Sequence, residues 1–278
     1  MNDNKHRMRV KDPLGMRMKE FYEDRTRMSL PRRTFTVIRL DGKAFHTYTR
    51  GLQKPFDNDL STDIDDAVCV LMQNIQGAKL AYCQSDEISI VVTDFDKIGT
   101  GAWFDGNIQK MVSVSSSILT AEFNKNRILR ELTNGTYEVG FSKDLASLKD
   151  LVGISMAYFD SRVFTIPELH EVYNYLIWRN KDCIRNSVSM VAQSVFSHKQ
   201  LEGKSRVVQM EMLKDIGKNW EYHDDRNKYG RVIMNKTYIH GDDPKKQYER
   251  HRWESIPAWD FLMGMDTIKS ILDIKPNE

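Results

Sequence analysis

The chain has 278 residues, enough to bury a substantial core in one large domain, or in one domain with an appended region. Its net charge of +2 comes from 41 basic and 39 acidic side chains, so the overall balance does not indicate a polyanion partner. The polar N-terminus excludes a signal peptide, no apolar run reaches the roughly 18 residues of a membrane span, and the 3 cysteines lack CxxC spacing. We therefore expect a cytoplasmic globular protein without a membrane partner, a disulfide framework or a zinc site.

Hydrophobic periodicity predicts alternating helices and strands over the first three quarters of the chain. In chain order these are a helix over 13–31, a strand over 34–40, a helix over 61–77, strands over 80–83 and 88–93, a helix over 107–130, a strand over 152–159 and a helix over 167–197. The turn between the second and third strands predicts a hairpin. This β-α-β-β-α-β order predicts an α+β, ferredoxin-like fold: an antiparallel sheet with helices on one face.

Two carboxylates at predicted strand ends form the main candidate site. Asp41 follows the first strand, and Asp86 lies in the hairpin turn. If these strands are neighbours in one sheet, both carboxylates can hold Mg²⁺ against the phosphates of a nucleotide, and Gly42 permits close approach so that its carbonyl can be a further ligand. Each segment alone is more typical of an ordinary turn, but their joint position favours a metal site.

Other polar residues near these segments are weaker candidates. The two-residue period of a strand turns Glu87 to the face opposite Asp86, so Asp86 is the preferred ligand. The minor catalytic candidates are His46, although a lone His more often makes a structural hydrogen bond, and Ser85, which can also cap the turn. The cations expected near triphosphate oxygens, each also typical of a solvated surface charge, are Arg39, Lys54 and Lys110.

The long helix over 167–197 carries a polar stretch that can contact RNA. Its candidate residues are Arg179, Arg185 and Asn186, and Lys204 follows beyond the helix. A solvated helix face over an apolar core explains the same pattern. Sequence alone leaves both interpretations open.

Several blocks resemble the tRNA-His guanylyltransferase family and occur in that family's order. They are Arg39-Leu40-Asp41-Gly42-x-x-Phe45-His46, Lys54-Pro55-x-Asp57, Tyr82-x-Gln84-Ser85-Asp86-Glu87, and Phe159-Asp160-x-Arg162-Val163 followed by Tyr175-Leu176-x-Trp178-Arg179-x-x-Asp182-Cys183. The resemblance implies a polymerase-like palm that extends the 5′ end of tRNA in the 3′-to-5′ direction. ATP or GTP would activate a tRNA 5′-monophosphate, and the 3′-hydroxyl of an incoming nucleoside triphosphate would then attack it. A homotetramer is also implied.

The resemblance also implies roles for individual residues. Asp41, the Gly42 carbonyl and Asp86 would bind two Mg²⁺ per active site, and Ser85, Glu87 and His46 would join the two aspartates as catalytic residues. The implied nucleotide-binding residues are Arg39, Gly42, Lys43, Ala44, Phe45, His46, Lys54, Asp57, Ser85 and Lys110. The tRNA contacts we expect are Arg179, Arg185, Asn186 and Lys204.

One departure from the eukaryotic pattern indicates the branch of the family. Where eukaryotic members carry His-Ile-Asn-Asn-Leu-Tyr-Asn, this chain has Ile184–Met190, which resembles the guanylyltransferase-like branch that repairs truncated tRNA 5′ ends on a template. We therefore expect template-dependent 5′-end repair. The alternatives are obligate addition of one G to tRNA-His, a catalytically idle tRNA-binding protein that keeps the palm, and a nucleotide cyclase, against which the absence of a Gly-Gly-Asp/Glu-Glu-Phe turn argues.

The pattern weakens after Gly203, which suggests a division of the chain. We expect residues 1–203 to form the palm-like catalytic domain with its N-terminal helix, and residues 204–278 to form a helical and irregular C-terminal extension with a short helix over 207–216. Basic and aromatic residues alternate in the extension, which suits a polyanion surface, although interspersed aspartates dilute the pattern. We expect it to pack on the palm and face RNA.

Overall fold

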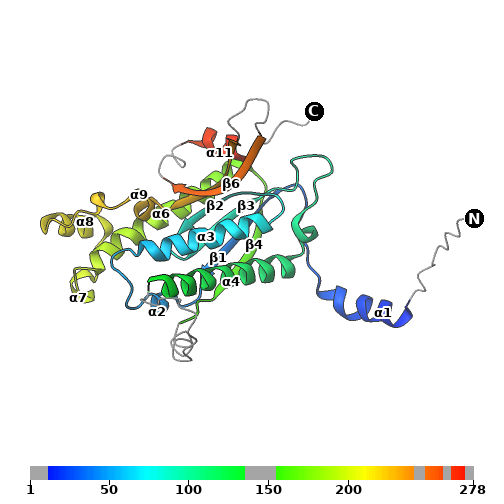
Figure 1. Cartoon of the computed structure of the whole chain (residues 1–278), viewed down its shortest axis with the longest axis horizontal. Coiled ribbons are helices and arrows are strands. Elements are labelled where there is room, and N and C mark those ends of the chain that lie inside the picture. Colours follow the sequence, from blue (N-terminus) through cyan, green and yellow to red (C-terminus); the bar gives the residue numbers. More distant parts are fainter. Residues whose placement is uncertain (1–11, 135–154, 241–247, 259–263, 273–278) are drawn as a thin grey trace, which may run out of the picture.

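A computed structural model describes residues 12–134, 155–240, 248–258 and 264–272. Its centre is a 6-stranded sheet in the order β4-β1-β3-β2-β5-β6 (Figure 1). All neighbouring strands are antiparallel. The strands are β1 (Phe35–Gly42), β2 (Ala78–Gln84), β3 (Glu87–Val92), β4 (Phe159–Ile166), β5 (Arg231–His240) and β6 (Tyr248–Pro257).

Helices cover both faces of this sheet. Those described are α1 (Pro13–Met18), η1 (Lys19–Glu23), η2 (Asp24–Thr26), α2 (Phe45–Tyr48), α3 (Asn58–Asn74), η3 (Trp103–Gly106), α4 (Ile108–Asn134), α6 (Leu169–Gln193), α7 (His198–Leu201), α8 (Arg206–Asp215), η4 (Trp220–Tyr222), α9 (Asp225–Tyr229) and α11 (Met265–Leu272). None of these helices is both long and apolar enough to cross a membrane.

The prediction that helices lie on one face of the sheet is wrong. The crossover helices α3 and α4 do share a face, where they pack on side chains such as Ile38 and Ile90. The other face is covered by α6 and α11, which pack on side chains such as Leu80 and Val91. Every residue of β3 is buried, because this central strand has neighbours above and below it.

Local sequence explains how the elements around the site begin. Asp57 caps α3 by accepting a hydrogen bond from the backbone N–H of Leu60 at 2.8 Å, so the helix starts a few residues earlier than predicted. The N-terminal helix predicted over 13–31 is shorter, because α1 passes into π- and 3₁₀-helical turns that end at Thr26. The hairpin of β2 and β3 is confirmed, with Gln84 paired to Glu87 across the turn.

The fourth strand lies later in the chain than predicted. It was expected over 152–159, but residues 155–158 are not in a strand and β4 begins at Phe159; residues 152–154 lie outside the described part. β4 is an edge strand in which only Phe159 is buried. The polar residues of β4 therefore give only a weak strand signal, and the apolar run before β4 predicts the strand at the wrong position.

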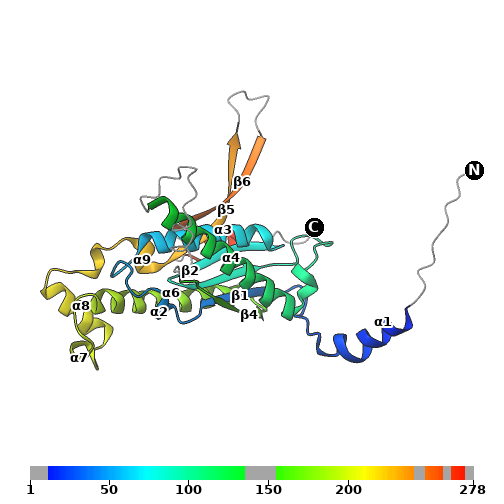
Figure 2. The same ribbon diagram turned by 60° about the horizontal axis from the view of Figure 1, so that its bottom comes forward.

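The C-terminal extension is not solely helical and irregular, as predicted. Its helix α8 confirms the short helix expected over 207–216, but β5 and β6 continue the sheet. Only the first part of β5, Arg231 to Met234, pairs with β2. The remainder of β5 pairs with β6 alone, and the two strands project from the body of the molecule (Figure 2).

Candidate active site

The end of β1 and the turn between β2 and β3 bring Asp41 and Asp86 to one place, as predicted. β1 pairs directly with β3, so that Leu40 lies opposite Ile88. A Cβ atom added to Gly42 would lie 2.7 Å from the Asp86 carboxylate and 2.2 Å from the Phe45 ring. Glycine is therefore needed here for close approach, which confirms the geometric part of the prediction.

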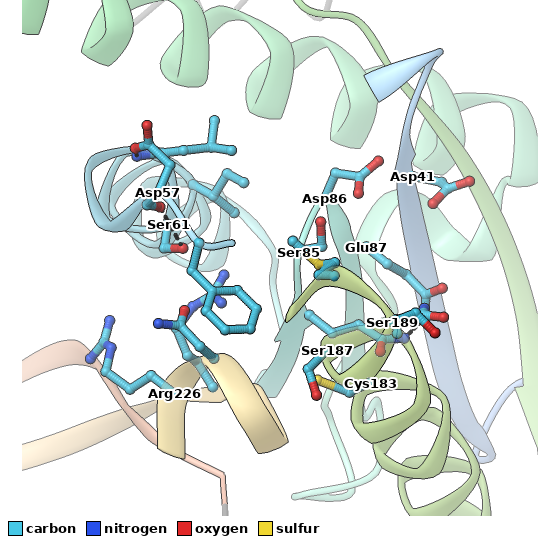
Figure 3. A pocket seen from close by; sticks show the side chains of 18 of the residues that line it. Asp41, Asp57, Ser61, Ser85, Asp86, Glu87, Cys183, Ser187, Ser189 and Arg226 are labelled. Carbon is cyan, nitrogen blue, oxygen red and sulfur yellow. Dashed lines mark hydrogen bonds between the residues drawn. The ribbon is translucent and has the colours of Figure 1, made fainter. Parts of the chain in front are cut away.

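A cavity of about 380 Å³ opens at this end of the sheet (Figure 3). It lies between the hairpin turn, α3, α6 and α9, and its lining includes Asp41, Asp57, Gln84, Ser85, Asp86, Glu87, Asn186, Ser187, Met190, Arg226 and Arg231. A second cavity of about 440 Å³ shares Asp57, Ser85 and Asp86 with the first and is lined also by His46 and Lys54. The two volumes are in the range of small-molecule and cofactor pockets.

Burial raises the pKa of both carboxyl groups and so disfavours their ionised form. It raises the pKa of Asp86 to about 6, and the charges of Asp41 and Glu87 add to the effect, although hydrogen bonds from Ser85 and the backbone oppose it. The pKa of Asp41 is raised by burial and by the charges of Glu87 and Asp160. Carboxylates clustered in this way are stabilised when a cation lies between them.

The donor set fits Mg²⁺. This ion binds hard oxygen ligands, usually one or two carboxylates together with water and phosphate oxygens. Asp41 and Asp86 supply two carboxylates beside the backbone of Gly42. Among the described residues, no group of three or more His, Cys, Asp or Glu side chains is placed so that it could hold a metal ion.

Glu87 points to the opposite face, as predicted, and is held in an ion network. Its carboxylate accepts hydrogen bonds from Arg39 at 2.5 Å, from Arg179 at 2.9 Å and from Gln84 at 3.0 Å. Two guanidinium groups thus already neutralise Glu87. The network corrects one expectation, because Arg179 is only 4% exposed and is not a surface contact for tRNA; Arg39 uses one guanidinium nitrogen for Glu87, and its role at the triphosphate stays a prediction.

Lys110 is not part of this site. It lies in the first turn of α4, which begins where the backbone N–H of Ile108 donates to Met28, before the start of β1. Its ammonium lies 5.9 Å from the centre of the Phe104 ring, and it lines neither cavity. The expectation that Lys110 joins Asp41 at one triphosphate site is therefore wrong for a single chain.

The other expected nucleotide-binding residues follow β1 or begin α3. Lys43, Ala44 and His46 are exposed, whereas the ring of Phe45 packs against Phe123 and Phe159 in the core. Phe45 is therefore mainly a core residue, although it also lines the second cavity. The tRNA candidates Arg185, Asn186 and Lys204 are exposed, and Asn186 also lines the first cavity.

Sequence reasoning missed a group of cavity residues from distant parts of the chain. Arg226 and Arg231 both bond to Asp65 on α3. Gln84 enters the sequence analysis only as part of a motif, yet its side-chain carbonyl oxygen is buried and has no hydrogen-bond partner among the described residues. No local pattern marks these residues, because the partners of Asp65 lie more than 160 positions away.

An antiparallel sheet that presents two carboxylates beside a nucleotide-sized cavity defines the class of protein: a nucleotidyltransferase. The family model described as "tRNAHis guanylyltransferase" matches residues 15–167. A bacterial tRNA(His) guanylyltransferase-like protein solved with ATP shares 35% identity and a TM-score of 0.75, covering 95% of this chain and 100% of the other. Its complex with GTP has a TM-score of 0.67 at 35% identity, covering 92% and 99% of the two chains.

A viral relative extends the same match. The protein R259 of Acanthamoeba polyphaga mimivirus is 30% identical over 248 residues, which cover 85% of this chain and 81% of that protein. The chain belongs to the tRNA-His guanylyltransferase family.

Proposed function

We propose that this enzyme adds nucleotides to the 5′ end of tRNA in the 3′-to-5′ direction. The observation that carries the proposal is the meeting of Asp41, Gly42 and Asp86 at one end of the sheet, beside a cavity and within the segment that the family model matches. Related structures hold ATP and GTP, which supports both nucleotides as substrates.

The catalytic unit is a polymerase-like palm within residues 1–203, with residues 204–278 as an extension that faces RNA. The order β4-β1-β3-β2 in the sheet and the placement of α3 and α4 on one face support this assignment. The ferredoxin-like unit has the same connectivity of strands and crossover helices. The projecting part of β5 and β6 supplies basic and aromatic side chains to the extension.

Asp41, the Gly42 carbonyl and Asp86 would hold two Mg²⁺. Bound metal ions would activate the attacking hydroxyl and neutralise the charge on the leaving group. Around them, Ser85 is exposed at the tip of the hairpin with a φ of 47°, and Lys54 and His46 line the adjoining cavity. These three side chains would bind and orient phosphate groups, while Asp57 holds the loop before α3 in place through Gln53 and Leu60. Glu87 would act by positioning Arg39 and Arg179.

The substrate we favour is a 5′-truncated tRNA that the enzyme repairs on a template. Residues Ile184–Met190, which depart from the eukaryotic pattern, contribute Asn186, Ser187 and Met190 to the lining of the cavity. A change at these positions would thus alter contacts beside the reacting ends. Obligate addition of one G to tRNA-His is the alternative for the same site.

The test uses tRNA transcripts with a 5′-monophosphate, ATP, Mg²⁺ and labelled nucleoside triphosphates. We expect extension of a truncated transcript by the nucleotides that its 3′ strand encodes, and loss of extension in the Asp41→Asn and Asp86→Asn variants. Asp266→Asn, at an exposed carboxylate on α11, is the matched control. Extension only of tRNA-His, and only by G, would favour the alternative. Binding of RNA without any extension would show an idle RNA-binding protein.

We further propose a homotetramer in the cytoplasm. The tetramer rests on the family resemblance, and sedimentation of the purified protein tests it. A monomer at micromolar concentration would contradict it.

A further inference from the structure

Two guanidinium groups share one carboxylate in the wall of the cavity. Asp65 on α3 accepts hydrogen bonds from Arg231 Nε at 2.7 Å, from Arg226 Nη2 at 2.7 Å and from the Ser255 hydroxyl at 2.6 Å. Both arginines line the cavity, and Figure 3 shows Arg226 on the side across from Asp41. Among the described residues no other carboxylate pairs with either arginine, so the cluster carries one excess positive charge.

Arg231 also has an unused donor. Its side chain is 2% exposed, and the Nη2 atom is buried without a hydrogen-bond partner among the described residues. A buried N–H that makes no hydrogen bond is costly, most of all on a charged group. A ligand phosphate would supply the missing acceptor, and this donor, unlike the unpartnered Nε atoms of Arg39 and Arg179, belongs to a residue that lines the cavity.

We propose that Arg226 and Arg231 form a phosphate-binding subsite separate from the carboxylate pair. Phosphate is the anion that guanidinium groups bind best, because two parallel N–H groups match two of its oxygens. Asp65 prepares the subsite by fixing both guanidinium groups before the ligand arrives. The ligand is a phosphate of the RNA strand or the pyrophosphate that the reaction releases, and this part of the inference rests on the proposed function.

The subsite lies close to the reacting end of the ligand. Arg231 is paired with Cys83 in the sheet, and Cys83 is three residues before Asp86 on the same hairpin. Three residues of extended chain span about 10 Å, which is an upper limit here because Ser85 and Asp86 form the turn. A ligand with one phosphate at Arg231 therefore has its other groups within reach of Asp41 and Asp86.

The experiment measures binding without nucleotide and without Mg²⁺, in EDTA, so that neither catalysis nor the carboxylates contribute. Arg226→Gln and Arg231→Lys are compared with the wild type and with Arg25→Gln, an exposed arginine on η2, outside the extension, that serves as control. The probes are a truncated tRNA transcript with a 5′-monophosphate, the same transcript with a 5′-hydroxyl, and inorganic pyrophosphate. We expect Arg226→Gln to weaken binding of phosphate-bearing probes about tenfold or more, and the control to leave it unchanged.

The probes separate the two sources of phosphate. Weaker RNA binding with unchanged pyrophosphate binding assigns the subsite to the RNA strand, and a loss confined to the 5′-monophosphate transcript assigns it to the terminal phosphate. A loss confined to pyrophosphate assigns it to the released product. Unchanged binding of all probes by a folded Arg226→Gln protein would overturn the proposal, and this holds even if Arg231→Lys does not fold. Weakened binding by a protein that never extends RNA would keep the subsite and reject the proposed function.

Discussion

The raised pKa of Asp86 predicts that this residue, when ionised, lowers the free energy of unfolding. In the folded chain the pKa is about 6, against an ordinary value of 3.8. At ~1.36 kcal/mol per pH unit, keeping Asp86 ionised at neutral pH costs about 3 kcal/mol. Asp86→Asn removes this charge and keeps the size of the side chain. We expect the variant to be inactive and, without metal, up to about 3 kcal/mol more stable than the wild type at pH 8.

The sign of the effect depends on pH. A raised pKa means that the folded state binds more protons than the unfolded state between pH 3.8 and about pH 6. The contribution of Asp86 to the free energy of unfolding of the wild type therefore falls as pH rises through that window. Above the window, the destabilisation by Asp86 is complete. The advantage of the Asn variant should be greatest at pH 8 and should shrink as the pH approaches 4.

Urea unfolding followed by tryptophan fluorescence in EDTA measures the difference at pH 8 and at pH 4.5. Asp266→Asn, whose side chain is 96% exposed, is the control and should match the wild type at both. Added Mg²⁺ should stabilise the wild type but not Asp86→Asn, because only the former has both carboxylates. An Asn variant no more stable than the wild type at pH 8, or a gap that does not narrow in acid, would refute the reasoning.

Three other substitutions test the neighbouring contacts. Gly42→Ala should lower activity on the order of a hundredfold, because its Cβ would lie 2.7 Å from the Asp86 carboxylate and displace it; Gly99→Ala, with open space around it, is the control for a rate assay. Glu87→Gln should destabilise the fold by about 3 kcal/mol in urea, because Arg39 and Arg179 lose their shared carboxylate; unchanged stability would contradict the network. Asp57→Ala should cost about 1 kcal/mol by removing the cap of α3, and an unchanged urea midpoint would show that the cap contributes nothing.

The part of the fold that sequence predicted is the part with buried, apolar strands. β2 and β3 carry continuous runs of buried residues, β1 buries four of its eight residues, and α3 between β1 and β2 has a clear apolar face. β4 was misplaced because an edge strand buries little and its sequence is polar. β5 was missed although Val232 and Ile233 are fully buried, because exposed basic and aromatic residues follow them in the same strand.

The candidate site likewise contains residues that the sequence predicts and residues that it does not. Asp41, Gly42 and Asp86 were found because each lies at the end of a recognisable strand, and pairing of the strands brings them together. The role of Arg179 was misjudged because its burial depends on Glu87, which lies 92 positions away. A lone arginine on a polar helix looks the same in sequence whether it faces solvent or a buried carboxylate.

The ion networks around Glu87 and Asp65 help to stabilise the carboxylate pair of Asp41 and Asp86 at the end of the sheet. On the face covered by α6, Glu87 is shared by two arginines, and on the face covered by α3, Asp65 is shared by two more. The Asp65 network carries one excess positive charge, whereas Arg179 of the Glu87 network also pairs with Asp182 at 3.5 Å. Glu87, Arg226 and Arg231 line the cavity beside Asp41 and Asp86. Fixed positive charge on both faces of the hairpin offsets part of the repulsion between the two aspartates. If Arg226 and Arg231 bind phosphate as proposed, the charges that stabilise this end of the sheet also select the ligand.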